Sequence, residues 1–406
     1  MGACFCVDPN PDPDAGCRYT LASGSLKRAA EVVPRHLPLL RTLCDLKVPA
    51  IMLKDDVHIL DEALDVPHGD LNLEWVVPKR LFEPEQNASA AGCCCAPRRE
   101  LDPVGPNVKR ILLYMHGGAF VLCTPGSLRP CTAPLANALD AALCVPEYRR
   151  PPEHSIEEAI EDGFVAYEYL LETYPGVEIL IGGESAGGSL AATMLTRLRE
   201  SHLPMPSKAL LMSPWTDISG EGSEAGLVNT RESNGLDYLP LDLIAFIAKQ
   251  ALGELDPKTV PASPVYAQGD LQVLPPILVL YGHEEVLRAQ IEHFVEVWTQ
   301  KGARIASHGV PGGLHAPVLF SFCHGPSRDA LPEVSNFFGR PEDSGWNPAR
   351  QGQDVEAPPP QQQFRRVRVF PRANPDSNAT SPAPSPKRLV RLNAETARMV
   401  RVENAL

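Results

Sequence analysis

Short apolar runs alternate with longer amphipathic ones between residues 108 and 340. The short runs are almost continuously aliphatic or β-branched, as expected for parallel strands that are covered on both faces. The longer runs repeat their apolar residues every three or four positions, which predicts helices with one buried face. The alternation therefore predicts an α/β fold with a mostly parallel sheet and helices on both faces. The predicted strands are 109–115, 141–147, 178–182, 207–212, 276–281 and 304–309, and the main predicted helices are 156–173, 186–199 and 286–301.

Three segments interrupt this alternation. Residues 1–82 precede the first predicted strand and have largely helical spacing around 26–64. Residues 214–262 separate two strands, contain a helical run at 241–252, and are too long for a simple connection. We predict that both segments contribute to a helical lid over the carboxyl ends of the strands. Residues 83–107, which include three consecutive cysteines and several prolines, are predicted to be a surface insertion of the core domain 108–340.

The composition changes after residue 340. Residues 341–406 hold ten prolines and only eleven Ile, Leu, Val or Phe residues, which is too few apolar side chains for a packed core. We predict that this segment is a disordered tail. Its basic cluster Arg365-Arg366-Val367-Arg368 could contact an acidic partner or anionic lipid, although a solvated linker is the simpler interpretation.

Composition and charge exclude several protein classes. The chain has 406 residues, of which 44% are hydrophobic, so it can support a large core. Its 37 Lys and Arg against 50 Asp and Glu give a net charge of −13, which argues against a nucleic-acid binder. No apolar run reaches the roughly 18 residues of a membrane-spanning helix, and the first 20 residues do not have the pattern of a secretory signal. The expected location is the cytoplasm.

The 11 cysteines do not form a recognisable framework. Their number is odd and no secretory signal accompanies them, so a set of structural disulfides is not expected. Because neither a Cys-x2-Cys pair nor a His pair with ligand spacing occurs, no structural metal site is expected either.

The amino terminus carries features of a lipidated protein. Gly2 follows the initiator methionine, and Cys4 and Cys6 stand where palmitoyl groups could be added. Two acyl chains would be enough for stable membrane anchoring, whereas one gives marginal binding. Cys6, however, occupies the position where the myristoylation pattern has Ser or Thr. Peripheral membrane attachment and an ordinary unmodified terminus therefore both stay open.

The strongest chemical motif is Gly-Glu-Ser-Ala-Gly at 183–187, between a predicted strand and a predicted helix. Glycines on both sides of the serine allow the sharp turn that lifts a hydroxyl above the edge of a sheet. The start of the helix behind it favours negative charge. This context predicts Ser185 as a nucleophile.

A second motif belongs to the same kind of machinery. His-Gly-Gly-Ala-Phe at 116–120 directly follows a predicted strand, 69 residues before Ser185. Consecutive glycines let backbone N–H groups point at an anion without interference from side chains. We predict that Gly117 and Gly118, with the N–H group of Ala186, form an oxyanion hole.

A serine hydroxyl needs a neighbouring base, and in this arrangement a carboxylate and then a histidine follow the serine along the chain. His315 lies in a glycine-marked loop after the last predicted strand, whereas His308 lies within that strand and His293 in mid-helix. The acid is expected after strand 276–281, where Glu284 and Glu285 both could reach the imidazole. Glu284 is favoured because it comes first after the strand. Asp217 comes too early in the order and is predicted to anchor the lid.

Taken together, these motifs resemble the hormone-sensitive-lipase family of α/β-hydrolases, which includes bacterial acetyl-esterases and arylacetamide deacetylase-like enzymes. The matching stretches run in family order over about 110–320, and they are HGGAF (116–120), YRRPPEH (148–154), GESAGG (183–188), SPWTD (213–217), DYL (237–239), SPVYA (263–267), GHEEVL (282–287) and LHAP (314–317). The chain departs from the family at the acid, which is usually Asp, and at Ala119, where a third glycine is more common. We interpret YRRPPEH as structural, with Arg149 and Glu153 bracing the loops.

The resemblance implies an eight-stranded sheet, a lid built from the N-terminal segment and the insertion after SPWTD, and hydrolysis of small carboxylic esters without a cofactor. It implies Ser185, His315 and Glu284 as the catalytic triad and Gly117, Gly118 and Ala186 as the oxyanion donors. Short-to-medium acyl chains are the expected substrates. An amidase or deacetylase activity on the same residues, and a ligand-binding pseudoenzyme, are the alternatives.

Overall fold

The computed structural model describes residues 36–49, 52–53, 55–82, 102–201, 203–219, 237–322, 324–339 and 366–371. Gly2, Cys4 and Cys6 lie outside these residues, so the prediction of lipidation at the amino terminus is not tested. Most of the predicted insertion 83–107 lies outside them as well.

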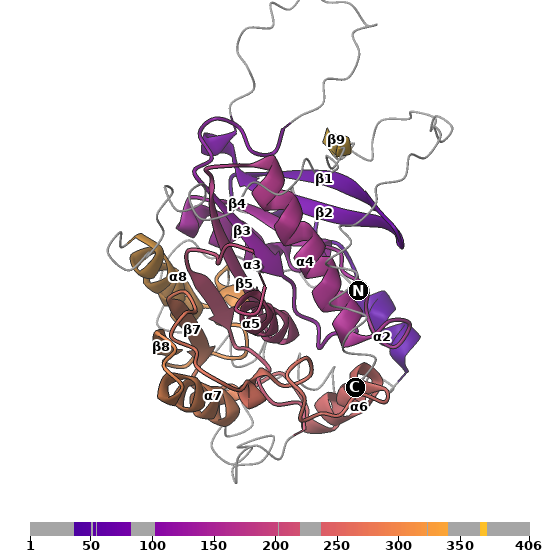
Figure 1. Ribbon diagram of the computed structural model, residues 1–406, viewed down its shortest axis with the longest axis vertical. Coiled ribbons are helices and arrows are strands. Elements are labelled where there is room, and N and C mark those ends of the chain that lie inside the picture. The colour runs from indigo at the N-terminus through magenta and orange to yellow at the C-terminus, as the bar shows by residue number, and fades with distance from the viewer. Residues whose placement is uncertain are drawn as a thin grey trace, which may run out of the picture.

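A single twisted sheet runs through the centre of the protein (Figure 1). Its strands follow the spatial order β8-β7-β6-β5-β3-β4-β2-β1-β9. The six strands from β3 to β8 are parallel to one another, whereas β2, β1 and β9 continue the sheet in antiparallel fashion. The strands are β1 (Val57–Val66), β2 (Gly69–Pro78), β3 (Arg110–Met115), β4 (Ala142–Pro146), β5 (Glu178–Glu184), β6 (Ala209–Met212), β7 (Ile277–Gly282), β8 (Ile305–Val310) and β9 (Arg366–Pro371).

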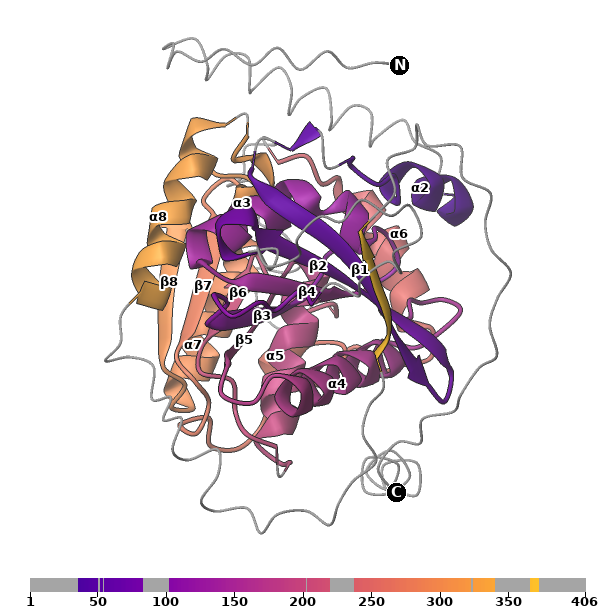
Figure 2. The ribbon, with the colours of Figure 1, turned by 90° about the horizontal axis from the view of Figure 1, so that it is seen from above.

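Helices cover both faces of this sheet (Figure 2). The alternation of side chains along each strand divides the core in two: Ile111 and Leu113 of β3 pack on the side of α4, α5 and α7, and Leu112 packs on the side of α3 and α8. The helices are α2 (Leu37–Cys44), α3 (Arg129–Leu139), α4 (Ile156–Thr173), α5 (Ala186–Leu198), α6 (Leu241–Leu252), α7 (Arg288–Gln300) and α8 (Gly325–Gly339). The six parallel strands and the four helices at 156–173, 186–199, 241–252 and 286–301 thus confirm the sequence prediction to within two residues at their ends.

The amino-terminal part of the sheet corrects one prediction. Helical spacing was expected around 26–64, but α2 is the only α-helix there among the described residues, and β1 and β2 form an antiparallel hairpin. The hydrophobic positions of β1 fit a helix and a strand about equally well. The turn at Gly69, with φ of 124°, and the full ladder to β2 decide in favour of the strand.

The edge of the sheet beside β1 corrects a second prediction. The predicted disordered tail contains β9, which pairs with β1 and adds a ninth strand to the expected eight. Its sequence Arg-Val-Arg-Val-Phe alternates charged and apolar residues, which suits an edge strand. The apolar content averaged over all of 341–406 does not reveal a strand of 6 residues. The rest of that range lies outside the described residues.

Helix α2 is attached to loops that follow the carboxyl ends of β3 and β4. The Arg41 guanidinium donates from Nε to the Val121 carbonyl at 2.9 Å and from Nη2 to the Pro151 carbonyl at 2.5 Å. Arg150 pairs with Asp45 just beyond the helix, with both N–O distances 3.1 Å. These bonds hold α2 at the end of the sheet where a lid was predicted.

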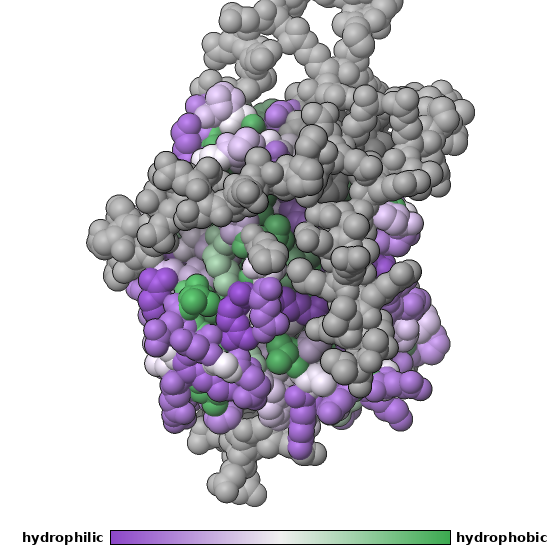
Figure 3. Space-filling model, viewed as in Figure 1, coloured by the Kyte–Doolittle hydropathy of each residue, from purple (hydrophilic) through white to green (hydrophobic). Residues whose placement is uncertain are grey.

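The described surface is that of an ordinary folded domain. Hydrophilic residues predominate among the coloured atoms of Figure 3, and apolar ones occur in small groups. Within the described ranges, no helix combines the length and the apolar character needed to cross a bilayer.

Candidate active site

Ser185 stands at a sharp turn between β5 and α5. Its backbone has φ of 56° and ψ of −124°, a region that non-glycine residues rarely occupy. A Cβ atom on Gly183 or Gly187 would come within 2.4 Å or 2.0 Å of the Met115 carbonyl oxygen, so only glycine fits on either side of Ser185. Unlike the buried residues around it, Ser185 is partly exposed. The turn thus presents its hydroxyl group at the end of the sheet, as the sequence predicted.

The glycine loop after β3 lies directly beside this turn. The Gly117 N–H group donates to Oε1 of Glu184 at 2.6 Å. That bond corrects the expectation that Gly117 serves the oxyanion hole, because its amide is already engaged by a carboxylate. Gly118 has φ of 112°, and a Cβ atom there would lie 2.1 Å from the Leu122 carbonyl oxygen. This close packing fixes the course of the loop beside Ser185.

His116 directly precedes the two glycines and helps to hold their loop in place. Its ring is buried and stacks on Tyr148 with 4.2 Å between the ring centroids. The Tyr148 hydroxyl donates to the His116 carbonyl at 2.7 Å. Burial lowers the pKa of His116 to about 3, so this imidazole stays neutral at physiological pH.

His315 lies in the loop after β8 and is almost fully buried. Its Nδ1 atom is 3.4 Å from Oε1 of Glu285. The other carboxylate oxygen of Glu285 accepts from the Ser213 hydroxyl at 2.5 Å and from the Gly282 N–H group at 2.7 Å. A carboxylate held in this way orients the histidine and favours a proton on Nδ1, which leaves Nε2 free to act as a base.

The carboxylate that contacts His315 is therefore that of Glu285, and not that of Glu284 as the sequence favoured. Glu284 uses its backbone N–H group to bond the Gly313 carbonyl at 2.9 Å, and its side chain is only half-buried. Glu285 instead turns back over the end of β7, where its carboxylate bonds the Gly282 amide. Both glutamates follow the same strand, and the direction of each side chain depends on a turn that the sequence does not specify.

Ser213 connects the acid to the other parts of the site. It follows β6, and the Ser185 N–H group donates to the carbonyl of the preceding Met212 at 2.9 Å. The Ser213 hydroxyl also accepts from the Ala316 N–H group at 2.9 Å. The Ser185 turn, Glu285 and the His315 loop are thus joined through the end of β6. From the sequence, Ser213 was recognised only as part of the SPWTD stretch and had no predicted role.

Among the described residues, three buried carboxylates act electrostatically on His315. Burial alone would lower the pKa of His315, but the bond to Glu285 and the charges of Glu285, Asp237 and Glu184 raise it above its ordinary value. Burial raises the pKa of Glu184 to about 7 and that of Asp237 to about 6, in spite of the N–H groups that bond them. A positive charge on His315 is therefore stabilised by its surroundings. Glu184 and Asp237 lie in the GESAGG and DYL stretches, but no role was predicted for either from the sequence.

The predicted supporting residues make the expected contacts. Asp217 accepts from the Ser219 hydroxyl at 2.6 Å, and its own N–H group donates to Gln290 at 3.0 Å, which attaches the start of the insertion to α7. Glu153 pairs with Arg41 of α2 at 2.7 Å. Both interactions agree with the bracing and anchoring roles inferred from the sequence.

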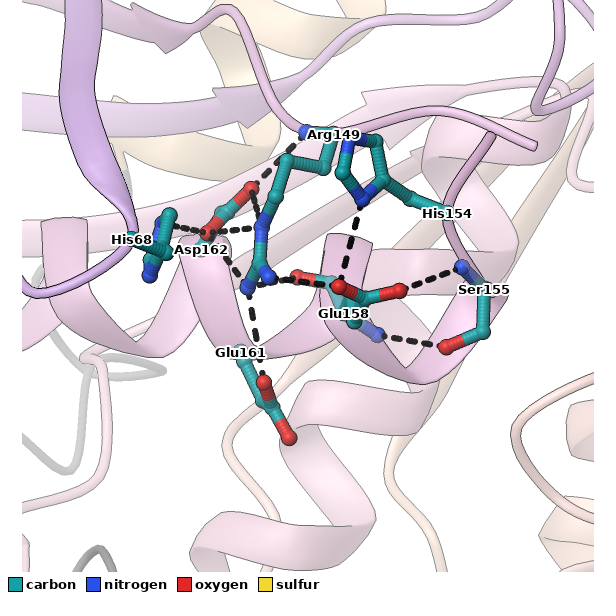
Figure 4. A network of polar contacts seen from close by, with 7 residues as sticks. All are labelled: His68, Arg149, His154, Ser155, Glu158, Glu161 and Asp162. Atoms are coloured by element: carbon teal, nitrogen blue, oxygen red, sulfur yellow. Dashed lines mark hydrogen bonds and ion pairs between the residues drawn. The ribbon is translucent and has the colours of Figure 1, made fainter. Parts of the chain in front are cut away.

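Arg149 forms the centre of a polar network beneath the loop after β4 (Figure 4). It bonds the fully buried Asp162 through Nε and Nη2, and Glu158 through Nη1 at 2.7 Å. His68, from the β1–β2 turn, reaches the same Asp162 at 3.0 Å. The network ties the hairpin, the loop and α4 together, and it confirms the structural interpretation of Arg149.

Replacing Asp162 with Asn is expected to lower the free energy of unfolding by about 2 kcal/mol, because Arg149 loses its most buried charged partner. Glu161→Gln is the matched control. Glu161 contacts Arg149 only at 3.4 Å and is partly exposed, so its loss should change stability by less than about 0.5 kcal/mol. Urea unfolding of both variants measures the difference, and equal stabilities would contradict the assignment.

Comparisons with known proteins support the fold described above. Residues 112–319, just over half of the chain, match the family described as alpha/beta hydrolase fold. An acetyl-hydrolase from Streptomyces hygroscopicus is 36% identical over 216 residues, which are 52% of this chain and 70% of the relative. An esterase from Acinetobacter venetianus is 28% identical over 229 residues, or 56% of this chain and 74% of the relative.

Solved structures show the same fold. An esterase/lipase from an uncultured bacterium superimposes with a TM-score of 0.63 at 24% identity, covering 82% of this chain and 100% of the other. The structure of EstE5 soaked with p-nitrophenyl butyrate gives a TM-score of 0.62 at 25% identity, covering 80% and 98%. Carboxyl esterase 2 from the fungus Tuber melanosporum gives 0.63 at 20% identity, covering 82% and 98%.

Proposed function

The chain belongs to the alpha/beta hydrolase fold family, and on that premise we propose that it hydrolyses small carboxylic esters with Ser185 as nucleophile. Relatives named acetyl-hydrolase and esterase support this class of reaction. The observation that carries the proposal is the contact of His315 with the buried Glu285, which Ser213 joins to the Ser185 turn.

The arrangement suits a two-step acyl transfer. Ser185 attacks the ester carbonyl carbon while Nε2 of His315 accepts the hydroxyl proton, and Glu285 stabilises the resulting imidazolium. The N–H groups of Gly118 and Ala186 are the proposed donors to the oxyanion. His315 then protonates the departing alcohol, and a water molecule activated by the same imidazole releases the acid from Ser185. The reaction needs neither a metal nor a cofactor.

Short-to-medium acyl chains are the proposed substrates. The likeness to an acetyl-hydrolase and to an esterase structure soaked with a butyrate ester favours this range. Amide hydrolysis is the second candidate, because the same residues can attack an amide carbonyl.

The purified protein is expected to hydrolyse p-nitrophenyl butyrate and to react with a fluorophosphonate probe at one site. Peptide mapping should place the probe on Ser185. A series of esters from acetate to decanoate, together with p-nitroanilide amides of the same acids, defines the chain length and the bond that is cleaved. Failure both to hydrolyse these substrates and to react with the probe would exclude a serine hydrolase and favour a binding protein on this fold.

A further inference from the structure

Asp237 is the first described residue after 219 in the insertion between β6 and β7, and it is only 1% exposed. One carboxylate oxygen accepts from the Val286 N–H group at 2.8 Å. The other accepts from its neighbour Tyr238 at 2.8 Å and from the His315 N–H group at 3.4 Å. This buried carboxylate is therefore bonded by three backbone N–H groups.

Two of these N–H groups belong to the catalytic loops. Val286 directly follows Glu285, so Asp237 holds the acid loop one residue from the triad carboxylate. His315 is bonded through its own backbone, and the Tyr238 hydroxyl donates to the carbonyl of the same His315 at 3.3 Å. Both backbone groups of the catalytic histidine are thus held by consecutive residues of the insertion.

The position of Asp237 also matters electrostatically. Among the described residues, three carboxylates act on the His315 ring: Glu285 from the loop after β7, Glu184 from the end of β5, and Asp237 from the insertion. Glu285 bonds the ring directly. Asp237 adds a second negative charge on the side of the insertion, where a low-dielectric environment strengthens its effect.

We propose that Asp237 is a positioning residue, which uses the insertion to hold His315 against Glu285 and to stabilise the protonated imidazole during ester hydrolysis. The inference rests on the function proposed above. It makes the insertion part of the catalytic machinery in addition to its expected role in covering the site.

The test is the pH profile of kcat/KM for p-nitrophenyl butyrate, because its acid limb reports the protonation of the catalytic base in the free enzyme. Asp237→Asn is expected to reduce kcat/KM by about 10- to 100-fold, mainly through kcat. Its acid limb should move to lower pH, because His315 loses a neighbouring negative charge and its pKa falls. A loss of structural support alone would reduce the rate without moving this limb.

Asp217→Asn is the matched control. Asp217 is another buried carboxylate of the same insertion, and its side chain bonds Ser219 and Tyr266. The acid limb should stay in the wild-type position in this variant. An unshifted limb in Asp237→Asn, or an equal shift in Asp217→Asn, would overturn the inference.

Glu184 requires its own control, because it also faces His315 and its pKa of about 7 lies in the same pH range. The effect of Asp237→Asn is therefore measured a second time in a Glu184→Gln background, where the shift to lower pH should persist. If the shift occurs only while Glu184 is present, the assignment to His315 is wrong.

Rates are expressed per active site titrated with the fluorophosphonate probe, so that a partly folded preparation is still measured on its folded fraction.

Asp237→Glu provides a second variant. It keeps the charge, so the acid limb should stay close to that of the wild type, but its longer side chain displaces the backbone bonds and should lower kcat. Wild-type kcat in this variant would contradict the positioning role. A wild-type protein without esterase activity would instead refute the proposed function.

Discussion

Replacing Ser185 with Ala should reduce kcat for p-nitrophenyl butyrate by about 10⁶-fold, since a triad acts as a unit and the loss of its nucleophile removes nearly all covalent catalysis. The residual rate would come from substrate binding and the oxyanion donors. The variant should also lose reaction with the fluorophosphonate probe. Far-UV circular dichroism and the Tm should stay near wild type, because the turn depends on the glycines beside Ser185 and not on its hydroxyl.

Ser201→Ala is the control for this experiment. Ser201 lies just after α5, and its hydroxyl caps the helix by donating to the Leu198 carbonyl at 2.9 Å. Activity should stay within about twofold of wild type. A Ser185→Ala enzyme that retains the wild-type rate would refute the assignment of the nucleophile and would point to another residue.

The sharp turn that carries Ser185 could be predicted from the sequence because the residues that form it are close together in the chain. Gly183 and Gly187 are needed where a side chain would collide with the Met115 carbonyl, and Ser185 itself lies between a buried strand and a helix. The Met115 carbonyl is distant in the sequence, but the residues that accommodate it fall within five consecutive positions, so they form a recognisable motif. The parallel strands were predictable for the same reason, because burial on both faces makes each one continuously apolar.

The glutamate that contacts His315 and the β1–β2 hairpin could not be predicted in this way. The choice between Glu284 and Glu285 depends on a turn whose geometry is set by Gly282 and by Ser213, which is more than 60 residues away in the sequence. The assignment of β1 as a strand likewise depends on pairing with β2. In each case the decisive contact is non-local, and the local pattern allowed two answers.

The donors of the proposed oxyanion hole could be predicted only in part, again because a non-local contact decides. The Gly-Gly pair after β3 correctly predicted a loop beside Ser185. The sequence does not indicate, however, in which direction a single N–H group of that loop points. Gly117 bonds Glu184, which had no predicted role within the Gly-Glu-Ser-Ala-Gly motif. The role of Asp237, which lies in the DYL stretch, was missed for a related reason, because two of its three partners are backbone groups on distant loops.

Replacing Glu285 with Gln is expected to reduce kcat by about 10⁴-fold, whereas Glu284→Gln should stay within about twofold of wild type. The Glu285→Gln substitution removes the negative charge that stabilises the imidazolium. The new side-chain amide could also present an N–H group to Nδ1 of His315, which favours the tautomer with its proton on Nε2 and blocks the transfer from Ser185. Glu284 has no such effect, because its described contact with the histidine side of the site is a backbone bond to Gly313.

The two adjacent glutamates control for each other, since both substitutions remove one negative charge from the same turn. The long-range electrostatic effect on substrate binding should therefore be similar, whereas the contact with His315 belongs to Glu285. Because Glu285 also accepts bonds from Ser213 and Gly282, the Tm of each variant is measured beside kcat and KM. A large loss in Glu284→Gln with near-normal kcat in Glu285→Gln would restore the assignment first made from the sequence. It would also mean that the turn after β7 rearranges when substrate binds.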